Sequence, residues 1–219
     1  MDLVECCGQR MPVKVKICGI TNVADGLAAV EAGADALGFI FDERSPRSVR
    51  WEAVAALTHL LPATIVKVGV FVDAPADLVR RAIEECGLSL LQFHGSETPE
   101  YCLQFGLTSM KAFRIRDAGS LEPIPSYKTD AWLLDAYSQD KAGGTGEKFD
   151  WDLALEAQKL GRPIFLAGGL TPENVAEAVA HVRPYGVDVS SGVEAAPGKK
   201  DHAKVRAFIQ AARNGAAKA

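Results

Sequence analysis

The sequence lacks several features that would assign the protein to a common functional class. Lysine and arginine number 24 against 28 aspartates and glutamates, a formal net charge of −4 at pH 7, and no local run of basic residues offers a footprint for nucleic acid. No stretch approaches the roughly 20 apolar residues of a membrane-spanning helix. The opening "MDLVECCGQRM" lacks the basic and apolar regions of a signal peptide. We therefore expect a cytoplasmic protein with neither a nucleic-acid nor a membrane partner.

Cysteine and histidine are also few and without pattern. The five cysteines include no C-x-x-C pair, and the four histidines show no ligand-like spacing. Neither a disulfide framework nor a zinc site is indicated. The polar leader with Cys6 and Cys7 matches no fold element, so residues 1–11 are interpreted as an N-terminal extension.

A regular alternation of two patterns runs through the remainder. With 48% hydrophobic and 24% charged residues, the composition is that of an ordinary globular protein. Helical patterns, with apolar residues at i, i+3 and i+4, separate most of the short apolar runs that predict strands. The eight predicted strands are "VKVKICG", "DALGFIF", "TIVKVGVFV", "SLLQFHG", "SMKAFRI", "AWLLDAY", "RPIFLAGG" and "YGVDVSSG".

This alternation fits either a closed parallel barrel or an open doubly wound sheet. The even spacing of about 25 residues per unit favours a compact barrel. With no linker in view, residues 12–219 are predicted to form a single α/β domain, a (β/α)8 TIM barrel with eight parallel strands. Only "RDAGSLEPIPSYKTD" lacks a clear helix, because two prolines interrupt it. Helix starts are predicted at Asn22, at Thr98 with Pro99, and at Thr171 with Pro172.

The chemistry of such a barrel lies at the carboxyl ends of its strands. There the sequence places a thiol, acids, an imidazole and small polar groups on one rim. The terminal residues, in chain order, are Cys18, Phe41, Asp73, His94, Arg114, Asp135, Gly168 with Gly169, and Ser190 with Ser191.

The last two strand ends predict a phosphate site. In "LAGGLTPENV" two glycines allow close backbone approach to an anion, and a helix start offers free N–H groups, although an ordinary tight turn explains this stretch equally well. "DVSSGVE" adds the hydroxyl and amide groups of Ser190 and Ser191. Because this fold commonly holds phosphate after strands seven and eight, we interpret the two loops together as a phosphate cradle.

Cys18 and Asp135 are predicted to act as an acid and base pair. Alone, the thiol would be a small buried hydrophobe and the acid a turn cap. Across one rim, one group can protonate a leaving oxygen while the other removes a proton from carbon. Lys16 shares the face of Cys18 and is expected to lower the thiol pKa. Asp188 faces inward on the adjoining last strand, so we expect Lys16 and Asp188 within salt-bridge range.

Other candidates have weaker support. Arg47, in the polar loop "DERSPRSVRW", is either a surface arginine or a ligand for a substrate carboxylate. His94 shares a strand face with Gln92 and is either a core histidine or a site residue. "KAGGTGEKFDW" has the glycine content of a mobile active-site loop or of a linker. No Ser/His/Asp triad or metal cluster is indicated.

With these residues in view, the chain resembles the phosphoribosylanthranilate isomerase family of tryptophan biosynthesis. The similarity covers residues 13–213, and several motifs are family-specific. The matching stretches are "KICGIT", "ADALGFIF", "SPRSV", "VGVFV", "LLQFHG", "LLDA", "GGTGEKFDW", "FLAGGL", "NV" and "GVDVSSGVE".

The resemblance implies a (β/α)8 barrel that catalyses an Amadori rearrangement of a small phosphoribosyl substrate without a cofactor or metal. It implies Cys18 as general base and Asp135 as general acid, with Arg47 on the anthranilate carboxylate. Asp188 would lie near the reacting sugar and His94 among the substrate-binding residues. It leaves a monomer or a homodimer open. Phosphate would be held by Gly168, Gly169, Ser190 and Ser191.

Two kinds of rival protein remain. Related phosphosugar barrels use a lysine with glutamates or a pair of aspartates, and the thiol that ends the first strand here disfavours both. A non-catalytic binder that kept only the phosphate site is disfavoured by the presence of Cys18 and Asp135.

Overall fold

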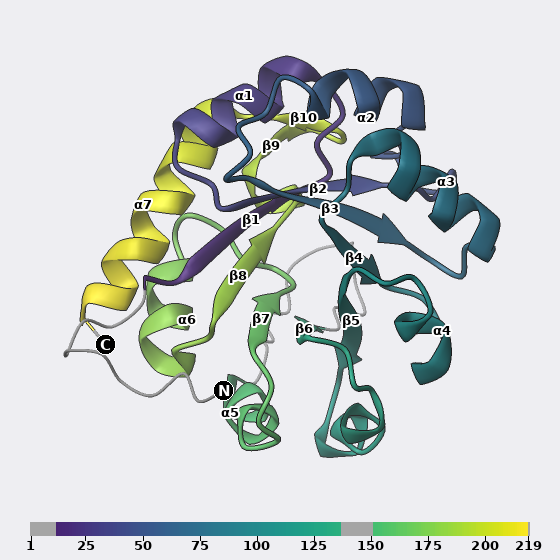
Figure 1. The fold of residues 1–219 in the computed structure, drawn as a ribbon. Coiled ribbons are helices and arrows are strands. Elements are labelled where there is room, and N and C mark those ends of the chain that lie inside the picture. The colour runs from purple at the N-terminus through teal and green to yellow at the C-terminus, as the bar shows by residue number, and fades with distance from the viewer. Residues whose placement is uncertain (1–11, 137–150, 219) are drawn as a thin grey trace.

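Eight parallel strands close into a barrel in this computed structural model, which describes residues 12–136 and 151–218 (Figure 1). Each strand pairs with the next in chain order, and β8 pairs with β1. This confirms the predicted fold class. The proposed extension, residues 1–11, and the glycine-rich loop "KAGGTGEKF" fall outside the described residues. The strands are β1 (Lys14–Cys18), β2 (Ala36–Ile40), β3 (Val66–Phe71), β4 (Leu90–Phe93), β5 (Thr108–Ile115), β6 (Ala131–Ala136), β7 (Ile164–Ala167) and β8 (Gly186–Val189).

Helices surround the barrel on its outside, as Figure 1 shows. None of those in the described part of the chain is long and apolar enough to cross a membrane. After β5 the proline-containing segment forms only two short 3-10 helices, as its sequence indicates, and a small hairpin follows β8. These elements are α1 (Val23–Glu31), α2 (Trp51–Thr58), α3 (Ala76–Cys86), α4 (Pro99–Leu103), η1 (Ala118–Leu121), η2 (Ile124–Ser126), α5 (Trp151–Gln158), α6 (Val175–Val182), η3 (Ser191–Val193), β9 (Glu194–Ala196), β10 (Lys199–Lys200) and α7 (His202–Lys218).

Two of the three predicted helix starts are confirmed. The Asn22 side chain accepts a hydrogen bond from the backbone N–H of Asp25 at 2.9 Å, and Thr98 caps α4 in the same way. The third prediction is wrong, because α6 begins at Val175 rather than at Pro172. There the Asn174 side chain accepts a hydrogen bond from the N–H of Thr171 at 2.8 Å, which holds the intervening residues in a turn.

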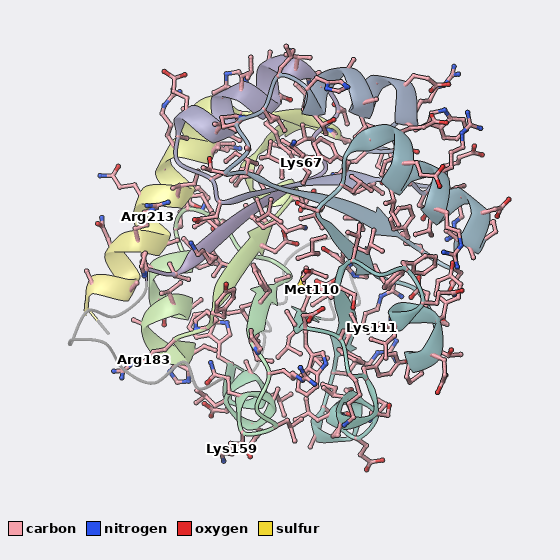
Figure 2. All side chains as sticks on the ribbon, viewed as in Figure 1. Lys67, Met110, Lys111, Lys159, Arg183 and Arg213 are labelled. Atoms are coloured by element: carbon pink, nitrogen blue, oxygen red, sulfur yellow. The ribbon has the colours of Figure 1, made fainter. Side chains whose placement is uncertain are left out.

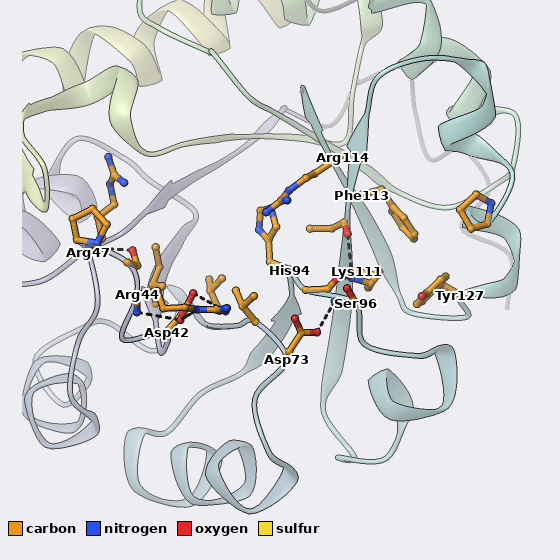
Figure 3. A pocket seen from close by; sticks show the side chains of 18 residues that line it. Asp42, Arg44, Arg47, Asp73, His94, Ser96, Lys111, Phe113, Arg114 and Tyr127 are labelled. Carbon is orange, nitrogen blue, oxygen red and sulfur yellow. Dashed lines mark hydrogen bonds and ion pairs between the residues drawn. The ribbon is translucent and has the colours of Figure 1, made fainter. Parts of the chain in front are cut away.

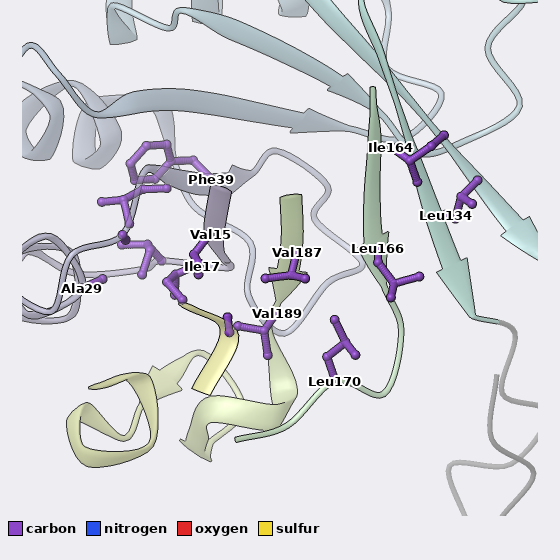
Figure 4. Close-up of a cluster of buried hydrophobic side chains, with 14 of the residues drawn as sticks. Val15, Ile17, Ala29, Phe39, Leu134, Ile164, Leu166, Leu170, Val187 and Val189 are labelled. Carbon is purple, nitrogen blue, oxygen red and sulfur yellow. The ribbon is translucent and has the colours of Figure 1, made fainter. Parts of the chain in front are cut away.

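Strand alternation divides the buried side chains into an outer and an inner set. The outer set packs between the barrel and the helices and forms the main hydrophobic core, in which Val15, Ile17, Leu166 and Val187 are fully enclosed (Figure 4). Met110, Leu133 and Phe165 belong to the inner set that fills the barrel. The upper end of the inner set carries the polar side chains of the site described below.

A buried ion pair fixes the loops after β3 and β4. Lys111 Nζ lies 3.1 Å from Glu97 Oε2, and the two side chains are only 3% and 2% exposed. Glu97 also accepts hydrogen bonds from the backbone N–H groups of Asp73 and Gly95. Lys111 donates to the carbonyl of Gly95 at 2.7 Å. The pair therefore holds the turn that follows His94.

Replacing Lys111 with methionine should destabilise the protein by about 3–5 kcal/mol, because the Glu97 charge would remain buried without its partner. Urea unfolding measures this difference. The matched control is Lys159→Met, which breaks the pair with Glu156 on the outer surface, where the side chains are 68% and 57% exposed (Figure 2). That change should cost less than about 1 kcal/mol. Similar losses in the two variants would contradict the assigned role of the buried pair.

Candidate active site

The inward-facing strand ends surround a cavity of about 530 Å³ at the carboxyl end of the barrel. All nine residues predicted as site residues line it: Cys18, Arg47, His94, Asp135, Gly168, Gly169, Asp188, Ser190 and Ser191. Two other predicted rim positions lie elsewhere. Asp73 lines a neighbouring cavity, and the Phe41 ring stacks on Phe71 with centroids 5.2 Å apart, in the outer core.

Cys18 ends β1 and sits above a buried ion pair. Lys16 Nζ donates to Asp188 Oδ1 at 2.9 Å, with the two side chains 1% and 9% exposed. The pair joins β1 to β8, where Lys16 and Asp188 are direct partners in the register. The predicted proximity of these two residues is therefore confirmed.

Lys16 acts on the thiol pKa in the predicted direction, but the net lowering expected from it is wrong. Burial raises the pKa of Cys18 above its ordinary value, and the negative charge of Asp188 acts in the same direction. Lys16 opposes both effects without overcoming them. Burial also disfavours the charged form of Lys16, but the Asp188 carboxylate outweighs it and keeps the pKa of Lys16 raised. Cys18 is thus a protonated thiol at neutral pH.

The Cys18 thiol and the Lys16 ammonium group fill the space next to Gly38, where a residue with a side chain would not fit. Gly38 pairs with Cys18 across β1 and β2. A Cβ atom at Gly38 would lie 2.8 Å from Cys18 Sγ and 3.0 Å from Lys16 Nζ. Any larger residue there would force the two groups to move.

Asp135 extends from the end of β6 and contacts His94. The His94 Nε2 atom lies 3.2 Å from Asp135 Oδ2, and the other ring nitrogen lies 3.0 Å from Gln92 Nε2. With the amide oriented in this way, Gln92 donates to Nδ1 and the Nε2–H of a neutral imidazole donates to Asp135. His94 therefore lines the cavity and contacts the carboxyl group, rather than lying alone in the core.

The opposite edge of the cavity has the features of an anion site. Gly168 and Gly169 have φ values of 81° and 67°, in the left-handed region that favours glycine, so the backbone there is free of side chains. The Ser190 Oγ atom is buried without a hydrogen-bond partner among the described residues. Ser191 begins η3 beside it. Exposed amides and an unused hydroxyl converge on this edge.

Arg47 reaches the cavity but its fork already holds a carboxylate. Its Nε and Nη2 atoms donate to the two oxygens of Glu194 at 2.7 Å each. Lys200 also binds Glu194, at 3.0 Å. Burial would raise the pKa of Glu194, but the hydrogen bonds from Arg47 and Lys200 outweigh it and hold the pKa below its usual value. Glu194 thus fixes the fork of Arg47, and its single negative charge is shared between Arg47 and Lys200.

A second cavity, of about 900 Å³, adjoins the first over the ends of β2 to β5 (Figure 3). The two share Ile40, Arg47, Val70, His94 and Arg114 in their walls. Sequence reasoning listed Arg114 on the rim without giving it a role, and it gave none to Glu194 although this residue closes the motif "DVSSGVE".

Within the described ranges, no group of three histidine, cysteine or acidic residues is arranged to hold a metal ion.

Comparisons with known proteins point to one family. Residues 15–211 match the family model described as N-(5'phosphoribosyl)anthranilate (PRA) isomerase. The N-(5'-phosphoribosyl)anthranilate isomerase of Geobacter sp. strain M21 is 57% identical over 200 residues, which cover 91% of this chain and 98% of that protein. The phosphoribosyl anthranilate isomerase structure from Thermotoga maritima has a TM-score of 0.86 with 41% identity, over 91% and 98% of the two chains. A structure of such an enzyme with reduced 1-(o-carboxyphenylamino)-1-deoxyribulose 5-phosphate has a TM-score of 0.83 with 39% identity and the same coverage.

The two charges beneath Cys18 should shift its titration in opposite directions. Asp188→Asn should lower the thiol pKa and Lys16→Gln should raise it, because the carboxylate disfavours the thiolate and the ammonium group favours it. The shifts are measured from the thiolate absorbance during a pH titration. The same titration of each variant with Cys18→Ser added is subtracted, which leaves the signal of Cys18.

The other thiols define the background of this titration. Burial raises the pKa of Cys86 to about 11 and that of Cys102 to about 12, and Cys6 and Cys7 are replaced by serine throughout. Shifts of the same sign in the two variants would show that the ion pair acts on Cys18 by some means other than charge.

Proposed function

Because the chain belongs to the N-(5'-phosphoribosyl)anthranilate isomerase family, we propose that Cys18 and Asp135 carry out the reaction of that family. The protein is an isomerase of tryptophan biosynthesis. It converts N-(5-phosphoribosyl)anthranilate to 1-(2-carboxyphenylamino)-1-deoxyribulose 5-phosphate by an Amadori rearrangement. The observation that carries the residue assignment is that a thiol and a carboxyl group, on strands far apart in the ring, face one cavity with an anion site at its edge.

The arrangement of the cavities supports one orientation of the substrate. The phosphate would lie at the edge formed by Gly168, Gly169, Ser190 and Ser191, where amides and an unused hydroxyl meet. The ribose would then lie between Cys18 and Asp135. The aromatic ring would extend into the adjoining cavity over β2 to β5, which Arg47 borders.

In the first step, Asp135 acts as general acid. It protonates the ring oxygen of the ribose as the bond from that oxygen to C1 breaks. The lone pair of the anthranilate nitrogen forms a C=N double bond, which leaves a positively charged Schiff base. The contact between His94 and Asp135 would keep the carboxyl group aimed at the ring oxygen.

In the second step, the Cys18 thiolate acts as general base. It takes the proton from C2, and the electron pair of that bond forms a C1=C2 double bond while the C=N electrons return to nitrogen. The resulting enolamine loses its hydroxyl proton and gains a proton at C1, which gives the ketone. Atoms and electrons balance without a cofactor.

Two further properties stay predictions for this chain. A small-molecule phosphoribosyl substrate follows from the family, whereas a monomeric or homodimeric state and a cytoplasmic location are proposals.

Cys18→Ala and Asp135→Asn should each lower kcat by about 10²- to 10⁴-fold, the usual contribution of a positioned acid or base. Activity is followed by the decrease in substrate fluorescence. Matched controls are Cys86→Ala, which removes a buried thiol remote from the cavity, and Asp77→Asn on the exposed side of α3. Wild-type turnover in both site variants would overturn the assigned roles.

The dependence of kcat/KM on pH should be bell-shaped. The reaction needs a charged thiolate together with a neutral carboxyl group, and carboxyl groups ordinarily ionise at lower pH than thiols. The rate depends on the product of the thiolate fraction of Cys18 and the neutral fraction of Asp135. Between the two pKa values, a rise in pH increases the first fraction by the same factor by which it decreases the second, so kcat/KM stays constant. Above the pKa of Cys18 the thiolate is fully formed, and only the neutral fraction of Asp135 continues to fall. The basic limb therefore reports the pKa of Cys18.

This basic limb should lie at higher pH than the titration of an ordinary thiol, because burial raises the pKa of Cys18. Asp188→Asn should move the limb toward lower pH. A profile without limbs, or a basic limb that does not follow the measured titration of Cys18 in this variant, would contradict the thiol as the base.

A further inference from the structure

Among the described residues that line the two joined cavities, Arg114 is the cationic residue whose side chain has no carboxylate partner. Its guanidinium group makes no hydrogen bond or ion pair with another described residue, and the residue is exposed. The other cationic side chains in these walls each contact a carboxylate. These pairs are Arg44 with Asp42 at 2.8 Å, Arg47 with Glu194 at 2.7 Å, and Lys111 with Glu97 at 3.1 Å.

The position of Arg114 directs its side chain into the site. It follows Met110 and Ala112 on the inward-facing side of β5, and it pairs with Asp135 in the register of β5 and β6. Arg114 lines both cavities. Figure 3 shows its side chain extending toward His94 on the neighbouring strand. The guanidinium group therefore stands where the two cavities join.

The order of the strands places this charge at the end of the substrate away from the phosphate. In a ring of eight strands, β3 and β4 lie opposite β7 and β8, and β5 lies opposite β1. With phosphate at β7 and β8 and the ribose between Cys18 and Asp135, the aromatic ring must extend over β2 to β5. The side chains of Ile40, Val70 and Phe113 give this region an apolar wall for the ring.

The ring bears a carboxylate, and its charge needs a partner in this region. Arg47 retains unused N–H groups, but Glu194 already binds two of its nitrogens, which leaves fewer donors for a substrate carboxylate. We propose that Arg114 is a substrate-binding residue that recognises the ring carboxylate with hydrogen-bond donors that no carboxylate among the described residues occupies. This inference rests on the proposed function and adds a second arginine to it.

The test compares two ligands that differ only in the carboxylate. One is reduced 1-(o-carboxyphenylamino)-1-deoxyribulose 5-phosphate, and the other is the same compound with hydrogen in place of the carboxylate. Arg114→Gln should weaken the first about tenfold or more and leave the second nearly unchanged, because a charge-assisted hydrogen bond is lost only with the first. Arg114→Lys, which keeps the charge without the fork, should recover part of the loss.

Isothermal titration calorimetry measures the dissociation constant of each ligand. In steady-state kinetics, Arg114→Gln should raise KM and change kcat less. Arg206→Gln, an exposed arginine on the outer helix α7, is the matched control and should change neither ligand. Equal weakening of both ligands, or no weakening, in Arg114→Gln would overturn the proposal. A wild-type protein that binds neither ligand and shows no turnover would instead overturn the proposed function itself.

Discussion

The ion pair between Lys16 and Asp188 is the interaction on which the site depends. It joins the first strand to the last at one level of the barrel, so it sets the register at which the ring closes. A buried pair of this kind often stabilises a fold no better than apolar residues of similar volume would. Its position directly beneath Cys18 supplies another reason for its presence, because it brings two opposite charges to bear on one thiol.

Charge compensation at the rim also ties together segments that are distant in the chain. Glu194 on β9 binds Arg47 from the loop after β2 and Lys200 on β10, so the hairpin closes over the edge of the cavity. On the other side, Glu97 and Lys111 fix the turns after β3 and β4. These contacts hold the rim side chains in place before substrate binds. In the proposed orientation, backbone amides would hold the phosphate of the substrate at one end and Arg114 would hold its carboxylate at the other.

The sequence was sufficient for the fold and for the residues that line the cavity, since strand parity and strand ends together place Lys16, Cys18, Asp135 and Asp188 on the inner face. The sequence did not predict properties that depend on several competing interactions at one residue. The thiol pKa depends on burial and on Asp188 as well as on Lys16, and only the packed structure gives their sum. The pairing of Arg47 with Glu194 depends on a hairpin that no local pattern positions. The start of α6 likewise depended on a single side-chain hydrogen bond from Asn174 that competes with the proline signal.

A protonated thiol in the free site has a consequence for the order of the chemistry. Burial makes the thiolate rare but also makes it a stronger base once formed, since the proton affinity of a base rises with its pKa. Ring opening places a positive charge on the Schiff base next to C2, on the side that Cys18 would face in the proposed orientation, and the thiol would release its proton to solvent in the open cavity. That charge would favour the thiolate in the low-dielectric cavity more than Lys16 does, because Asp188 offsets the charge of Lys16. In this arrangement protonation by Asp135 comes first, and it creates the electrostatic conditions under which Cys18 acts as a base.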